Sequence, residues 1–204
     1  MMRLFDSKKL IVVVIVALLT LLPVAACAPK AAEPPPQPPA PPAGTIAAEP
    51  SKIDMATLKT NFEILVKLRR YTPEVAAKLP VQLGLLVLPV KFVGEGWPAN
   101  EMVFVDLVIP PDVEMKGLDR SRGEDSVGIA VGTADSEGRF ESIMEPAAKL
   151  NWLLRSDWLP TVTPDLASLK PLPKGIYTIR ATGIDPRTVT TATWDLELAA
   201  PASK

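Results

Sequence analysis

The residue types that could do chemistry in this sequence are chiefly carboxylates, because its 204 residues include no histidine and a single cysteine. Without histidine, the chain has no Ser-His-Asp or Cys-His pair to activate a nucleophile and no histidine ligand for a metal. One cysteine forms no internal disulfide, and thiolate zinc or iron–sulfur sites need several cysteines. The composition therefore excludes most hydrolase and metalloenzyme mechanisms.

Paired carboxylates are the catalytic arrangement that this composition readily allows, since glycoside hydrolysis can use two acids without histidine. Arginines stand among the acidic residues, so a solvated, ion-paired loop is the simpler interpretation. The sequence therefore favours a protein that is not an enzyme, with a carboxylate-based glycosidase as the catalytic alternative. The acidic candidates that lie close together in sequence are Asp119, Glu124, Asp125, Asp135, Glu137 and Glu141.

The loops that carry these acidic residues could also hold a metal cofactor. Ca²⁺ needs only oxygen ligands and is the metal that they could hold, but the regular Asp-x-Asp-x-Asp-Gly loop is absent. Gly94-x-Gly96 has the spacing of a dinucleotide-binding turn, yet Pro98 leads into an alternating strand instead of the helix that such a turn must open. We expect no cofactor, and a tight turn at these glycines with Trp97 packed over the end of a β-sandwich.

The N-terminus has the features of an export signal. Arg3, Lys8 and Lys9 precede an apolar run over residues 10–22, which is interrupted only by Thr20. Thirteen residues at 1.5 Å each reach about 20 Å, less than the roughly 30 Å hydrocarbon core of a bilayer. A cleaved signal is therefore favoured over a permanent transmembrane anchor.

Residues 22–27, Leu-Pro-Val-Ala-Ala-Cys, resemble the lipobox of bacterial lipoproteins. The resemblance implies a signal peptide over 1–26, cleavage between Ala26 and Cys27, and a diacylglycerol on the Cys27 thiol. Because each buried methylene contributes about 0.8 kcal/mol, two or three acyl chains attach a protein to a membrane permanently. The implied location is the cell membrane or an outer membrane, lipid-anchored and facing outside the cytoplasm.

The segment 27–50 is then the lipidated cysteine followed by a tether. Positions 28–50 hold nine prolines and seven alanines, a composition that predicts disorder or polyproline II. At about 3.1 Å per residue, it would span up to roughly 70 Å. A ligand for a proline-recognising domain is the alternative interpretation.

Residues 51–80 are expected to be a helical segment. Met55, Leu58, Phe62 and Leu65 recur at the spacing of one helix face, and Ser51 with Asp54 fits a capping box. These signals favour a helix over 53–70, with a strand through residues 64–68 as the alternative. A second, short helix is expected from Thr72 to Leu79.

From residue 81 to 200 the pattern changes to alternation, with Gly, Pro, Asn and Asp between short apolar runs. Such a pattern predicts a mainly β domain, an antiparallel sandwich or barrel. Long loops are expected at 110–125, which is charged, and at 145–172. The candidate strands are 85–88, 90–94, 102–109, 126–131, 139–144, 175–181 and 189–198.

Four stretches resemble, in order, parts of bacterial Ig-like surface domains: 92–107, 132–140, 173–183 and 191–198. The resemblance covers roughly residues 85–199 and implies an antiparallel Ig-like β-sandwich. Adhesins, enzyme accessory modules and exported lipoproteins share this fold, so the resemblance implies no specific activity.

Two tryptophans in the second long loop are the candidate ligand or partner contacts. Residues 147–158 place Leu150, Leu153, Leu154 and Trp158 on one helical stripe, with Trp152 nearby. The stripe is either a helix that caps an open end of the sandwich or an exposed aromatic patch for a partner or a sugar ring.

These observations predict an exported surface lipoprotein whose Ig-like domain is a non-catalytic binding, adhesion or scaffolding module. Its partner would be another surface protein or a glycan, besides the membrane lipid at Cys27. The alternative is a carbohydrate- or small-ligand-binding accessory lipoprotein that uses Trp152, Trp158 and the charged loop. Nucleic acid is not expected, because removal of residues 1–26 leaves 19 basic and 22 acidic residues.

Overall fold

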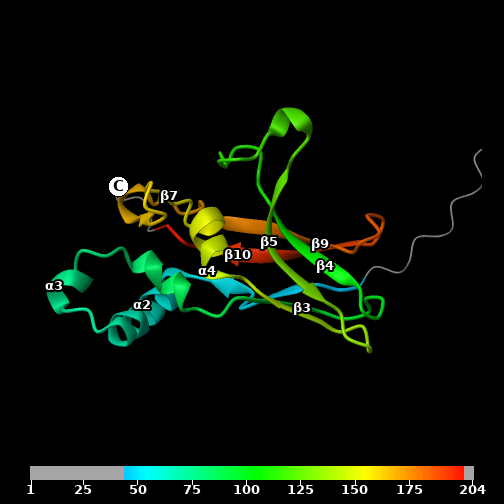
Figure 1. The fold of residues 1–204 in the computed structure, drawn as a ribbon, viewed down its shortest axis with the longest axis horizontal. Helices are drawn as coiled ribbons and strands as arrows, with labels where there is room; N and C mark the ends of the chain where they lie inside the picture. Colours follow the sequence, from blue (N-terminus) through cyan, green and yellow to red (C-terminus); the bar gives the residue numbers. More distant parts are fainter. Residues whose placement is uncertain (1–43, 200–204) are drawn as a thin grey trace, which may run out of the picture. The chain divides into compact units, whose positions relative to one another are not determined.

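The computed structural model describes residues 44–199, which form mainly β-structure in several sheets with some short helices (Figure 1). The predicted signal peptide, Cys27 and the first part of the predicted tether lie outside the described residues. The strands are β1 (Ala47–Glu49), β2 (Lys52–Ile53), β3 (Lys91–Gly94), β4 (Met102–Val108), β5 (Ser126–Thr133), β6 (Phe140–Ile143), β7 (Asp157–Trp158), β8 (Pro164–Asp165), β9 (Gly175–Thr182) and β10 (Val189–Leu196). The helices and helical turns are α2 (Met55–Arg69), α3 (Pro73–Ala76), η1 (Val81–Leu86), η2 (Arg120–Arg122), α4 (Pro146–Ala148), η3 (Lys149–Leu153) and η4 (Leu166–Ser168).

The described strands form three sheets. One has the order β1-β3-β6, the second has the order β2-β10-β9-β4-β5, and β7 pairs with β8. All neighbours are antiparallel except β2, which runs parallel to β10. A register shift between Val105 and Asp106 marks a bulge where β4 meets β5.

The core lies between the first two sheets, and the alternation predicted from the sequence is confirmed. In β4, Val103, Val105 and Leu107 are fully buried, whereas Phe104 points outward. Phe92 of β3 meets Trp194 of β10 edge to face, with ring centroids 5.7 Å apart and planes at 84°. This aromatic contact joins the two sheets at the centre of the core.

The helix expected over 53–70 is confirmed as α2, and the alternative strand is wrong. The amphipathic face predicted for this helix is also confirmed, because Leu58 and Leu65 are buried while Leu68 is exposed. The predicted cap is wrong in part: the Asp54 carboxylate alone caps the helix by accepting from the Thr57 amide at 2.9 Å. Hydrogen bonds from Thr57 lower the pKa of this carboxyl.

The boundary placed at residue 50 between tether and folded domain is wrong. Ala47–Glu49 form strand β1, which pairs with β3, and Ile46 and Ala48 are buried. The alternation of buried Ile46 and Ala48 with exposed neighbours makes this segment an edge strand despite its alanine-rich surroundings. The folded domain therefore includes residues that composition alone assigns to the linker.

The strand expected at 85–88 is also wrong, since residues 81–86 form the 3₁₀ helix η1. There the backbone of Gly84 lies against the α2 backbone at Leu58, and this close approach needs a glycine. The other six predicted strands are observed with small shifts at their ends.

Candidate binding site

The two ends of the sheets differ in structure, and we call them the entry end and the helical end. At the entry end, Thr45 bonds to Glu95, Trp97 to Gly138, and Glu101 to Ile184, so the chain enters the domain beside three turns. At the helical end lie α2, η1, α4, η3 and the β7–β8 hairpin, gathered together in Figure 1. Strands β1 and β3 extend from the entry end to the helical end along the first sheet. The two ends therefore lie on opposite sides of the core.

A cavity of about 500 Å³ opens at the helical end. It brings the two long loops together, since Glu114, Met115 and Lys116 come from the first and the other lining residues come from the second. Both predicted contact residues, Trp152 and Trp158, line it. We call this cavity the Trp158 pocket; its further lining residues are Asn151, Arg155, Ser156, Asp157 and Lys170.

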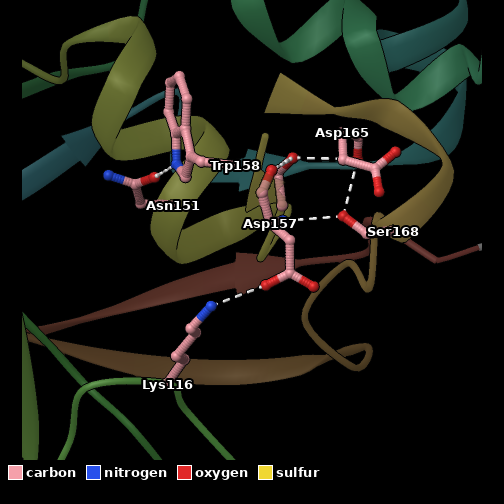
Figure 2. Close-up of polar contacts among 7 residues, drawn as sticks. Lys116, Asn151, Asp157, Trp158, Asp165 and Ser168 are labelled. Atoms are coloured by element: carbon pink, nitrogen blue, oxygen red, sulfur yellow. Dashed lines mark hydrogen bonds and ion pairs between the residues drawn. The ribbon is translucent and has the colours of Figure 1, made fainter. Parts of the chain in front are cut away.

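Trp158 is the exposed aromatic surface of the pocket, with 42% of the residue accessible to solvent. Its indole N–H donates to the Asn151 side-chain oxygen at 2.6 Å, which holds the ring against η3 (Figure 2). The helical stripe expected across 147–158 is wrong at this residue, because Trp158 belongs to β7. Its other members cap the core: Leu150, Leu153 and Leu154 are buried.

The hairpin that carries Trp158 is held by polar contacts with the segment after it. The Asp157 amide donates to the Ser168 hydroxyl at 2.8 Å, and that hydroxyl donates to the Asp165 carbonyl at 2.7 Å (Figure 2). Ser156 also reaches the Asp165 carbonyl, at 3.2 Å. These bonds fix a two-stranded hairpin that would be too short to be stable alone.

Charges line the pocket floor. Lys116 forms an ion pair with Asp157 at 2.9 Å, which joins the first long loop to β7. This hydrogen bond and the charge of Lys116, followed by the charge of Lys170, lower the pKa of the Asp157 carboxyl. Asp157 is therefore ionised near neutral pH, with two lysines beside it.

Arg155 is the structural residue of the pocket wall. Its guanidinium donates to the carbonyls of Lys170, Glu114 and Pro171 at 2.5, 2.8 and 3.2 Å, respectively. Its backbone has a φ of 48°, in the left-handed region that non-glycine residues rarely occupy. The three hydrogen bonds to carbonyls connect the two long loops and hold Arg155 in this backbone conformation.

The six acidic candidates do not form one site. Asp119 and Glu124 bond within their own turn around η2, Asp135 and Glu137 bond to Arg139, and Glu141 bonds to Lys91. Asp125 pairs with Arg180 at 2.8 Å. Each of these carboxylates therefore already has a hydrogen-bond or ion-pair partner. Among residues 44–199, no group of three or more Asp, Glu, Cys or His side chains is arranged to hold a metal ion.

A second charged cluster was not predicted. Arg180 of β9 lies between Asp125 and Asp106 of β4, and burial raises the pKa of Asp106 despite the opposing effect of Arg180. In sequence these residues are far apart, and only the pairing of β4 with β9 brings them together. Lys116 was also missed because its partner Asp157 lies 41 positions away, whereas Asn151 was missed although Trp158 is only seven positions away.

Comparison with known proteins gives no relative: no family model, curated protein or solved structure matches this chain. Within the part of the chain that the structure describes, no helix has the length and apolar character needed to cross a membrane.

Proposed function

We propose that this protein is a lipid-anchored surface lipoprotein whose domain is a non-catalytic binding module, and that it binds through the Trp158 pocket. One observation carries the proposal: two loops far apart in sequence form a single cavity with an exposed tryptophan. Pockets that combine an aromatic surface with a few placed polar groups are the usual form of a ligand site. Long loops on a rigid β scaffold are where binding residues concentrate.

We propose further that the domain is an Ig-like β-sandwich. The strand order β5-β4-β9-β10 would match C′-C-F-G, and β1-β3-β6 would match A-B-E. Tyr177 of β9 donates its hydroxyl to the carbonyl of Pro173, four residues upstream, at 2.8 Å, as in the tyrosine corner of such domains. The proposed assignment departs from the usual pattern in the first sheet, which has three strands here.

Within residues 44–199, the Trp158 pocket and the point where the chain enters the domain lie at opposite ends. In the proposed lipoprotein the lipid is on Cys27, so the tether joins the domain at the entry end, near Gly44. The Trp158 pocket is at the helical end.

The proposal is tested with Cys27→Ser and Trp158→Ala. The first change should move the protein from the membrane fraction to the soluble fraction. The soluble protein should then rebind to washed envelopes of the producing cells, and the added Trp158→Ala change should abolish rebinding. Ile184→Ala, an exposed apolar change at the entry end, is the matched control and should bind as before. Persistent membrane attachment of the Cys27→Ser, Trp158→Ala double variant, or equal rebinding of the proteins with and without Trp158→Ala, would contradict the proposal.

A further inference from the structure

We infer that the Trp158 pocket binds a saccharide that carries a carboxylate group, such as a uronic acid. The inference rests on the proposed function, because it assigns a ligand class to the pocket described there. It is carried by the juxtaposition of an oriented indole, polar side chains and one available ammonium group within a single cavity.

The aromatic surface suits the face of a sugar ring. The indole N–H of Trp158 is already bonded to Asn151, so the part of the ring left exposed is apolar. Sugar rings have faces of C–H groups that pack on such a surface, while their hydroxyls point sideways. Trp152, partly buried against the core, provides a second apolar wall.

The polar lining suits the hydroxyl groups around the ring. The Ser156 hydroxyl is buried and bonded to the carbonyls of Asp157 and Asp165, so the polar groups of the cavity that remain for a ligand are the Asn151 amide and the Asp157 carboxylate. Hydrogen bonds to a ligand would replace those that these groups make with water, which gives orientation and specificity. An aliphatic peptide side chain would leave these groups without partners, so the lining favours a saccharide over a peptide.

The charges of the pocket lining favour an acidic saccharide over a neutral one. Lysine and arginine contribute three cations to the lining (Lys116, Arg155 and Lys170) against two acids, Glu114 and Asp157. The Arg155 guanidinium is used by three carbonyls, and Lys116 is paired with Asp157. The Lys170 ammonium is exposed and forms no ion pair with any residue in 44–199, although its charge acts on the neighbouring Asp157 carboxylate. One available ammonium matches one carboxylate, whereas the phosphate chain of a nucleotide would need several donors.

The test compares trigalacturonic acid, whose carboxylates are charged, with its methyl ester, whose carboxyl groups are neutral and carry a methyl group. Binding to the intact Cys27→Ser protein is measured by calorimetry. We expect the acid to bind more tightly than the ester. Trp158→Ala should weaken the binding of both by at least about tenfold, as for a central aromatic contact. Trp158→Phe, which keeps an aromatic face, should restore part of that loss.

Lys170→Gln should weaken binding of the acid by about two- to fivefold, because an exposed ion pair contributes up to about 1 kcal/mol. It should leave the affinity for the ester unchanged. Lys59→Gln, on the exposed face of α2 outside the pocket, is the matched control and should bind like the parent protein. Thermal melting of each variant checks that the fold is kept.

Three results would overturn the inference. Equal affinity for acid and ester would exclude the carboxylate preference. Absence of saccharide binding, together with Trp158-dependent binding to envelopes, would exclude the saccharide but keep the proposed binding module. Saccharide binding that survives Trp158→Ala would place the site outside this pocket.

Discussion

Lys149 shows at the residue scale how the core tolerates a charged side chain. It is 3% exposed, and its ammonium donates to the Leu88 carbonyl at 2.6 Å. Burial lowers the pKa of this ammonium, and the nearby Glu145 only partly opposes the effect. Lys149 therefore holds the start of η3 against the end of η1 while its charge remains unfavourable to the fold.

This shift predicts a pH dependence of stability. Because the pKa is lower in the folded state than its usual value of 10.5, the unfolded chain binds the proton more tightly. The free energy of unfolding should therefore rise with pH in the window below 10.5, and this contribution should be lost as pH falls through the folded-state pKa. Lys149→Met should remove this part of the pH dependence, as measured by urea unfolding between pH 7 and 10.

Lys59→Met is the control for Lys149→Met, because it removes an exposed ammonium. It should keep the pH profile of the parent protein. A Lys149→Met profile that is identical to the parent would show that the buried ammonium does not contribute.

At the element scale, α2 is attached to the β domain through η1. Its buried Leu58 and Leu65 supply the apolar face, but isolated helices of this length are marginally stable in water. The contact with η1 is backbone to backbone at Gly84, closer than side chains allow. The helical end, and with it one side of the binding region, depends on this packing.

Gly84→Ala should destabilise the protein by about 1–3 kcal/mol, because the added Cβ would collide with the Leu58 carbonyl and force the helix outward. Gly128→Ala is the matched control: its Cβ would meet only the Asp106 carboxylate, at an ordinary 3.7 Å. That change should alter the free energy of unfolding by no more than about 0.5 kcal/mol. Equal effects of the two substitutions in denaturant unfolding would contradict the close approach at Gly84.

At the scale of the whole molecule, the first strand closes the core. β1 covers one edge of β3, and the segment after it gives the Pro50 carbonyl that accepts from the Trp194 indole at 3.0 Å. The described contacts of this edge lie within residues 44–199, so a chain that starts at residue 40 keeps all of them.

A chain that starts at residue 40 should therefore unfold in a single cooperative transition. A chain that starts at residue 51 should lose at least about 2 kcal/mol of stability, because it lacks the buried Ile46 and leaves the indole N–H of Trp194 without its acceptor. Thermal unfolding followed by circular dichroism compares the two. Identical melting curves would show that β1 is dispensable.

Local pattern determined much of this protein: the helix at 55–69, six of the strands and the alternation that buries Val103, Val105 and Leu107. These features follow from periodicity, which depends only on near neighbours in the chain. Trp152 and Trp158 could be named as candidates from their types alone. The lipid anchor at Cys27 lies outside the described residues and stays a prediction.

Tertiary structure alone decided the rest. It made β1 a strand because β3 offered an unpaired edge, and it made η1 a helix because Gly84 fits against α2. It also joined Lys116 to Asp157 across 41 positions and Asp125 to Arg180 across 55. The pocket exists only through such pairings, because the distance between residues along the chain says nothing about which loops two sheets will bring together.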